Sequence, residues 1–397
     1  MVRALLLLAV ASGCSFELRI GNAGDDVPTD ATDANEIDAN IDAEPGVDVI
    51  IPDASNNCFE GTWCRRKRLV IPAGRAVQGP HASFPMLVAR TTDADLAMYA
   101  RDDGHDIVFT DADGVTRVPY ERVRFNGTTG ELLAWVRVPS LQSAAQTVLY
   151  VYYGNAGAAE QQQREQVWST SFKGVWHLES NAEDSTQYHN NGTLSGDAAF
   201  DASGLVGGDV DLDALGGRIT MQDSASLDAT ATTGTFAMWI RFIDATDRIQ
   251  LVMTTSNALS TPSDGFSWSV QADGDHYFYP RVVTDDYNLI ANPFTNNAWH
   301  MSHVTFNFAN KSALLYVDGV PKSITVQNVS TLWTQVANPA NWLWGSNPDQ
   351  PSQMFTGRLD ELRVSNVVRS AGWILTEFRN QNAPLTFVDV DPPELLQ

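Results

Sequence analysis

Residues 235–242 read Thr-Phe-Ala-Met-Trp-Ile-Arg-Phe, an apolar run of strand length in which only Arg241 is charged. Similar runs lie on both sides of it, with turn residues between them. These runs are 174–178, 265–270, 299–306 and 313–317. After the last of them, Asp318-Gly319 leads into residues 321–326, which is a hairpin pattern. Many short strands separated by turns are typical of a β-sandwich or jelly roll, and we expect one over residues 167–390.

A smaller β-rich domain is expected before it, over residues 58–155. Its strand-length runs are 65–71, 84–88, 106–110, 132–138 and 147–153. Residues 156–166, rich in Ala and Gln, form the expected linker between the domains. In the second domain we expect one helix, at 371–380, and a C-terminal tail at 391–397. The fold class is therefore predicted to be all-β.

The N-terminus resembles a bacterial export signal over residues 1–13. Its apolar run 4–11 is too short to cross a bilayer core of roughly 30 Å as a helix, but it suits a secretion signal. Ala11-Ser12-Gly13-Cys14 resembles the lipobox of lipoproteins, although Leu or Val is more usual where Ala11 stands. That resemblance implies cleavage before Cys14 and a diacylglycerol on its thiol. The alternative is an ordinary signal peptide with an incidental cysteine.

Residues 14–57 are acidic and poor in apolar side chains, and Arg19 is the only cation among them. Such a segment cannot offset the entropy of ordering, so we expect a disordered tether. The formal charge of the whole chain is −23, which argues against a nucleic-acid partner and leaves carboxylates for calcium. The expected location is the bacterial envelope, with the lipid as the membrane attachment. Ser15, rather than Asp, after Cys14 favours the outer membrane or the cell surface.

Two further cysteines, Cys58 and Cys64, lie where the tether enters the first domain. Two cysteines outside the cytosol most often pair, so we expect a local disulfide. The alternatives are two free thiols or a metal site, and two cysteines without nearby histidines make a poor zinc site.

Four motifs in the second domain resemble the laminin-G-like modules of the concanavalin A-like lectin/glucanase superfamily. They are Trp176-His177-Leu178, residues 184–193, Tyr316-Val317-Asp318-Gly319 and residues 357–365. The resemblance covers residues 167–389 and implies a jelly roll of two antiparallel sheets. Residues 102–114, 118–121, 135–139 and 152–155 of the first domain resemble a domain of unknown function that recurs before such modules in secreted bacterial proteins.

The resemblance also implies one structural calcium on the rim of the jelly roll. The matching carboxylates are Asp184 and Asp360, with Glu179 and the side chain of Asn190 as weaker candidates. Calcium prefers six to eight oxygen ligands of these kinds. The alternative is that Asp184 caps a turn with its own backbone and that Asp360 pairs with Arg363 or Arg358.

Glycoside hydrolysis requires two carboxylates across the scissile bond. The glucanase pattern Glu-x-Asp-x-Glu has its nearest match at Glu36-Ile37-Asp38, which lies in the tether and lacks the second Glu. We therefore expect a protein that is not an enzyme.

Aromatic rings that stack on sugars are the remaining candidate chemistry. Trp239, Trp268 and Trp299 lie in strand patterns and are expected in the core. Five aromatic residues in loops or at strand ends are better candidates for ligand contact: Tyr277, Tyr279, Tyr287, Trp333 and Trp342.

The sequence thus predicts a non-catalytic cell-surface lipoprotein that binds polysaccharide or another envelope component. Two alternatives stay open, a structural envelope protein without a soluble ligand and a glycoside hydrolase of the concanavalin A-like superfamily.

Overall fold

The computed structural model describes residues 57–396 except for 213–215, 243–249, 256–264, 272–274, 282–287, 292–296, 311, 323–324, 328–339, 346–347 and 349–350. The predicted signal, Cys14 and the acidic tether lie outside the described residues, as do the candidate ligand residues Tyr287 and Trp333.

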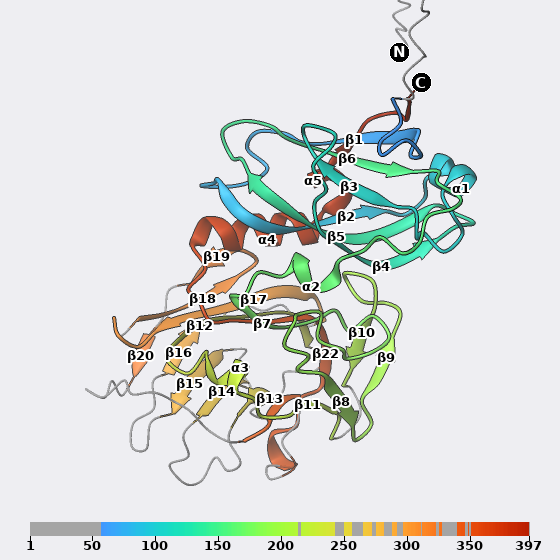
Figure 1. Ribbon diagram of the computed structural model, residues 1–397. Helices are drawn as coiled ribbons and strands as arrows, with labels where there is room; N and C mark the ends of the chain where they lie inside the picture. The colour runs from blue at the N-terminus through green and yellow to red at the C-terminus, as the bar shows by residue number, and fades with distance from the viewer. Residues whose placement is uncertain are drawn as a thin grey trace, which may run out of the picture. The chain divides into compact units, whose positions relative to one another are not determined.

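The first domain is built from two antiparallel sheets that pack face to face (Figure 1). One has the order β23-β1-β6-β3, with β24 also paired to β1, and the other has the order β2-β5-β4. The elements are β1 (Arg65–Ile71), β2 (His81–Arg90), α1 (Ala94–Tyr99), β3 (Val108–Asp111), β4 (Tyr120–Asn126), β5 (Glu131–Leu141) and β6 (Thr147–Tyr153). Alternate residues of these strands, such as Leu69 and Ile71, are buried in the shared core, which confirms the predicted small β-sandwich.

The C-terminal strands β23 (Asp389–Val390) and β24 (Glu394–Leu395) complete the first domain rather than the second. The prediction left residues 391–397 as a tail, but these two-residue strands cover the open edge of β1. The Leu396 amide donates to the Cys64 carbonyl at 2.8 Å, and the predicted Cys58–Cys64 disulfide is formed beside it. The described chain therefore starts and ends at the same edge of the first domain.

The second domain is the predicted jelly roll, with two large antiparallel sheets around one core. We call the sheet that contacts the first domain the near sheet, and the other one the far sheet. The near sheet contains β7 (Phe172–Trp176), β9 (Ala199–Asp201), β10 (Asp209–Asp211), β12 (Thr233–Phe242), β17 (Trp299–Asn307), β18 (Ser312–Val317), β19 (Val320–Pro321) and β22 (Gly357–Ser365). The far sheet contains β8 (Gly192–Ser195), β11 (Arg218–Met221), β13 (Gln250–Thr254), β14 (Gly265–Val270), β15 (His276–Arg281), β16 (Asn288–Ala291), β20 (Thr325–Gln327) and β21 (Trp342–Gly345).

Strand β12 lies at the centre of the near sheet, between β17 and β22. Phe236, Met238 and Ile240 point into the core between the sheets, because successive side chains of a strand point to opposite faces. Trp239, on the other face, is 1% exposed, and its indole donates to Gln381 at 2.7 Å. The expected burial of Trp239 and Trp268 is confirmed. The expectation for Trp299 is wrong, because this residue begins β17 and is only half-buried.

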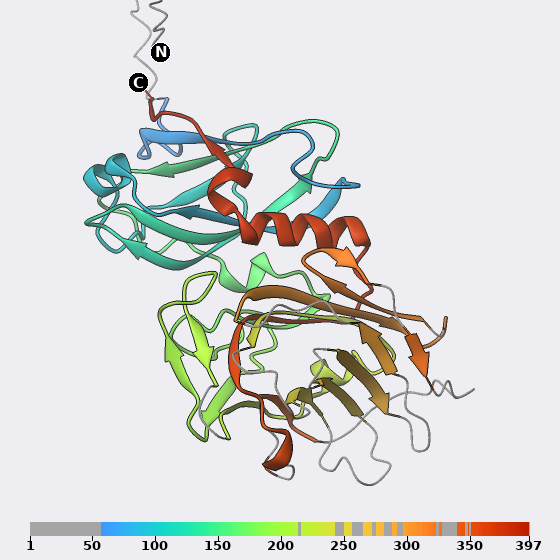
Figure 2. The same ribbon diagram turned by 180° about the vertical axis from the view of Figure 1, so that it is seen from behind.

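Helices are few and mostly short among the described residues. Besides α1, they are α2 (Arg164–Val167), α3 (Ala225–Asp228), the 3₁₀ turn Pro351–Gln353, α4 (Ala371–Asn382) and α5 (Pro384–Phe387). Of the described helices, none has both the length and the apolar character needed to cross a lipid bilayer. Helix α4 matches the predicted helix, and Figure 2 shows it between the two domains.

Helix α4 contacts both domains. Toward the first domain, the Asn380 side chain bonds both backbone groups of Leu87, at 2.7 and 3.0 Å, and Trp373 packs on Phe84 with ring centroids 4.8 Å apart. Toward the jelly roll, Glu377 faces the near sheet. The helix therefore attaches the near sheet to the first domain.

The guanidinium of Arg363 lies at the centre of this junction and is 2% exposed. It donates to Glu377 of α4 and, at 2.9 Å, to Glu361 of its own strand β22. Its plane lies over Trp135 of the first domain at 4.3 Å and near Trp168 at 5.2 Å. Arginine suits such a place because it stacks on aromatic rings and is less strongly hydrated than lysine.

We predict that Arg363→Met lowers the free energy of unfolding by about 3–5 kcal/mol, because it removes the guanidinium that the buried carboxylates of Glu361 and Glu377 share. The matched control is Arg241→Met, on the same sheet, whose guanidinium bonds the Asn297 side chain in an exposed setting. The control should change stability by less than about 1 kcal/mol. Urea unfolding followed by tryptophan fluorescence measures the stability of both variants. Equal losses of stability would contradict the role of Arg363 as the buried cation of the junction.

Candidate functional site

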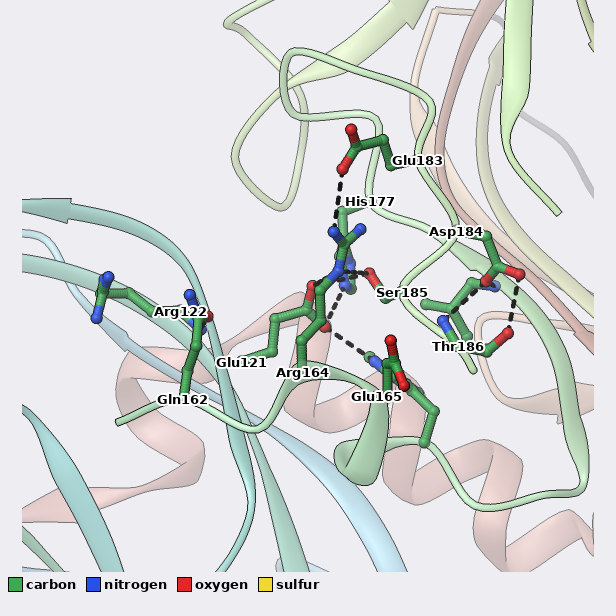
Figure 3. A network of polar contacts seen from close by, with 12 residues as sticks. Glu121, Arg122, Gln162, Arg164, Glu165, His177, Glu183, Asp184, Ser185 and Thr186 are labelled. Carbon is green, nitrogen blue, oxygen red and sulfur yellow. Dashed lines mark hydrogen bonds and ion pairs between the residues drawn. The ribbon is translucent and has the colours of Figure 1, made fainter. Parts of the chain in front are cut away.

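A polar cleft of about 170 Å³ lies at the seam between the first domain and the jelly roll (Figure 3). Strand β4 supplies Glu121 and Arg122, the linker supplies Gln162 and Arg164, and the loop after β7 supplies His177 and Glu183. Charged side chains from both domains thus meet in one place, which the sequence did not predict.

Glu121 forms the floor of the cleft, and both of its carboxylate oxygens are fully used. Its Oε1 accepts from the Ser185 hydroxyl at 2.7 Å and pairs with Arg164 Nε at 3.0 Å. Its Oε2 accepts from the Trp168 indole at 2.9 Å and pairs with His177 Nε2 at 3.2 Å. Burial alone would raise the pKa of Glu121, but His177 and these hydrogen bonds hold it below the ordinary value.

His177 lies between two carboxylates, since its Nδ1 is 2.8 Å from Glu361 Oε1 and its Nε2 faces Glu121. Its ring also stacks on Trp135, with centroids 5.7 Å apart. Burial opposes the charged imidazolium, but Glu361 and Glu121 outweigh it and raise the pKa of His177 to about 10. The imidazole is therefore protonated at neutral pH.

This arrangement is poorly suited to proton transfer. A general acid or base needs a pKa near the working pH and a free position for the substrate, whereas Glu121 stays ionised with four donors around it. The chain of contacts runs onward from Glu121 through His177 and Glu361 to Arg363. The floor of the cleft is therefore part of the junction between the domains, and the outer side chains, such as Arg122 and Glu183, are the ones that a ligand could meet.

Asp184, a predicted calcium ligand, caps a turn instead (Figure 3). Its Oδ1 accepts from the amides of Val175 and Thr186, at 3.0 and 2.9 Å. Its Oδ2 accepts from the Thr186 hydroxyl and the Asn190 amide, at 2.8 and 2.9 Å. Four donors leave no room for a cation, so the turn-capping alternative describes this residue.

Asp360, the second predicted ligand, is fully buried, and its Oδ2 accepts from the Val206 amide at 2.9 Å. Among the described residues its Oδ1 has no hydrogen-bond partner. Burial, reinforced by the neighbouring charge of Glu361, raises the pKa of Asp360 well above its usual range. The predicted pairing with Arg363 or Arg358 is wrong, because Arg363 pairs with Glu361 and Glu377, and Arg358 pairs with Asp201, Asp209 and Asp211.

The two weaker calcium candidates also have other partners. Glu179 pairs with Arg124 and accepts from the Gly208 amide at 2.6 Å. The Asn190 amide donates to the Lys173 carbonyl at 2.6 Å and accepts from the Ser224 hydroxyl at 2.7 Å. In the part of the chain that the structure describes, no three His, Cys, Asp or Glu side chains form a metal site. The four predicted residues do not fit a calcium ion.

Of the described aromatic residues that were predicted to contact a ligand, two lie on the far sheet's outer face and one lies in the core. Tyr277 is half-buried on β15, on the face of the far sheet away from the core, because its neighbours His276 and Phe278 are buried. Tyr279 occupies the next position of that face, opposite Ser267. Trp342 is 4% exposed and packs against Phe236 in the core, with centroids 5.4 Å apart, so its selection as a ligand contact was wrong.

The pKa of His177 leads to a prediction about alkaline pH. Its folded value of about 10 exceeds the unfolded value of about 6.5. The stabilisation is therefore complete below about pH 6.5 and is lost as the pH rises toward 10.

We predict that the stability difference between the native protein and His177→Gln shrinks by a few kcal/mol from pH 6 to pH 10. Parallel urea titrations at both pH values measure it. A difference independent of pH would mean that His177 is neutral in the folded protein.

Comparison with known proteins identifies both domains. Residues 213–375 match the model of the concanavalin A-like lectin/glucanases superfamily. Residues 103–187 match the model of a domain of unknown function (DUF2341). No curated protein matches the chain.

Solved structures resemble the chain at low sequence identity. The binding domain of botulinum neurotoxin DC, in complex with SialylT, is 12% identical with a TM-score of 0.40, and the match covers 53% of this chain and 52% of that one. Domain 4 of AbnA, an extracellular GH43 arabinanase from Geobacillus stearothermophilus in complex with arabinotriose, is 15% identical with a TM-score of 0.40, covering 53% and 98%. The binding domain of Paraclostridial Mosquitocidal Protein 1 is 15% identical with a TM-score of 0.41, covering 52% of each chain.

The chain thus spans about half the length of the neurotoxin binding domain that it matches. It carries a concanavalin A-like domain of the lectin/glucanases superfamily, preceded by a domain of the DUF2341 family.

Proposed function

We propose that this chain is a non-catalytic binding protein of the bacterial cell surface, anchored by a lipid on Cys14, whose jelly roll binds polysaccharide. The observation that carries the proposal is the chemistry of the outer face of the far sheet. That face combines hydroxyl-bearing side chains with aromatic positions, which is the combination that sugar recognition uses.

A single row of residues crosses this face over six neighbouring strands. In register, it contains Thr193, Thr220, Leu343, Thr254, Ser267 and Tyr279. All of them except Leu343 carry a hydroxyl group. Thr193 is exposed and Thr220 half-buried, whereas Thr254 and Ser267 are buried. The accessible part of the row therefore begins at β8 and β11, and Tyr277 adds a half-buried ring on β15.

The far sheet also lies on the side of the jelly roll away from the first domain (Figures 1 and 2). The near sheet is occupied by contacts with α4 and the first domain. Residue 57, where the described chain begins, lies at the opposite edge of the first domain, beside residue 396. A tether entering there would hold the far sheet outward.

A non-catalytic role is supported by the carboxylates of the described residues. Glu121, Glu377 and Asp184 are each surrounded by donors, and Asp360 is sealed from solvent. None of these has the open position that an acid or nucleophile of a glycoside hydrolase requires.

The anchor is tested by Cys14→Ala in a bacterial host. We predict that the native protein incorporates an alkyne-labelled fatty acid and sediments with membranes, because thioether-linked and amide-linked chains together hold a protein firmly. The variant should lose the label and become soluble. A native protein recovered with its first thirteen residues intact would contradict the anchor.

Sugar binding is tested by screening the purified full chain against a polysaccharide array, with and without EDTA. We predict that Tyr277→Ala weakens the best binder about fivefold to tenfold, as loss of one stacked ring does, and that EDTA has no effect, since the predicted calcium ligands have other partners. The matched control is Tyr99→Ala, an exposed tyrosine of the first domain.

Two results would overturn this part of the proposal. One is an array without any binder, which would favour the structural alternative. The other is release of reducing sugar by the purified protein, which would establish a hydrolase.

A further inference from the structure

A second cavity, of about 430 Å³, lies at the domain junction, apart from the polar cleft and from the far sheet. It is lined by strands β2 and β5 and by Arg124 of β4 from the first domain, by residues 205–207 of the jelly roll, and by residues 382–386, which run from the end of α4 into α5. Its volume lies within the range of roughly 300–1,000 Å³ that small-molecule sites occupy.

The walls of this cavity are aliphatic. They include Leu87, Leu132, Leu133, Leu205, Pro384 and Leu385, and no aromatic side chain is among the lining residues described. A sugar site normally offers a ring to stack on, so this cavity is unsuited to a sugar. Flexible aliphatic walls instead match a flexible aliphatic chain.

One cation of the lining lacks a full counter-charge. Arg90 Nε lies 3.4 Å from Asp93 Oδ2, but its N–H has no hydrogen-bond acceptor among the described residues. Asp93 is already neutralised by Lys67, whose ammonium lies 2.5 and 2.6 Å from its two oxygens. Neighbouring Asp95 pairs with Arg65. Two cations therefore share Asp93, and one positive charge remains.

Arg124, the other cation of the lining, is shared by two carboxylates, Glu131 at 3.2 Å and Glu179, so that part of the wall is acidic rather than basic. The side chain of Arg90 is 32% exposed, so its outer nitrogens are accessible to a ligand. The cavity is thus apolar along its length and cationic at one point of its wall.

From this combination we propose that the cavity binds an alkyl chain with an anionic head group. The chain would lie against the leucines, and the head group would accept hydrogen bonds from Arg90. A charge-assisted bond of this kind is stronger than a neutral one. Because the walls come from both domains, the ligand would bind only to the assembled junction. The proposal does not depend on sugar binding by the far sheet.

The test is isothermal titration of the full chain with octanoate, decanoate and dodecanoate below their micelle concentrations. We expect affinity to rise about fourfold for each added methylene group until the cavity is filled. An alkyl trimethylammonium of equal length should bind at least tenfold more weakly than the carboxylate. Vesicles of phosphatidylglycerol offer the same chemistry from a membrane, and binding from either source supports the proposal if the variants below abolish it.

Two variants address different parts of the cavity. Arg90→Gln removes the cation, and Leu385→Asp places a carboxylate at the mouth, where the 48% exposed Leu385 can be replaced without opening the core. Each substitution should weaken the binding of decanoate at least tenfold and leave the unfolding midpoint of the protein unchanged. The matched control is Leu395→Asp, at an exposed position on β24 outside the cavity, which should bind normally. Equal affinity for both head groups, or undiminished binding by both variants, would overturn the proposal.

Discussion

The arrangement of the two domains depends on one buried cation. Arg363 extends from the near sheet and lies over two tryptophans of the first-domain side, while its donors reach Glu361 and Glu377. Burying an unpaired charge costs free energy, and ion pairing offsets that cost only when the partners are held in a fixed geometry. The near sheet, α4 and the first domain must therefore adopt one relative placement for the charge to be satisfied. His177 and Glu121 extend the same requirement to strand β4.

This constraint explains how the candidate sites are distributed. The junction occupies the outer face of the near sheet, so the proposed sugar binding is assigned to the far sheet. The aliphatic cavity and the polar cleft are both lined by residues of the two domains. The described chain begins beside the C-terminal strands, at the edge of the first domain.

Much of the fold was predictable, because strand signals are local. Residues 235–242 have the apolar run of β12, and residues 371–380 have the pattern of α4. The Cys58–Cys64 pairing was also predictable, because two neighbouring cysteines in a chain expected to be exported most often pair. By contrast, β23 and β24 have two residues each, too few to show a periodicity. The four-residue strand β21 was not recognised either, so Trp342 was expected in a loop or at a strand end, whereas it is buried in the core.

The junction could not be predicted, since its members are distant in sequence. Glu121 and Glu361 both contact His177 but are far apart in the chain. A charge between two apolar residues of a buried strand, such as Arg363 between Leu362 and Val364, is a signal that a buried partner exists. It does not identify that partner. Asp184 was misassigned for a related reason, because a carboxylate in a polar loop caps turns as readily as it binds calcium.

The central claim is that the two β domains form one cooperative body. Differential scanning calorimetry of the purified protein tests it directly. We predict a single transition whose calorimetric and van't Hoff enthalpies agree, because the buried cluster that runs from Arg363 through Glu361 and His177 to Glu121 joins the two domains. Two separate transitions, each with the enthalpy of one domain, would contradict the account.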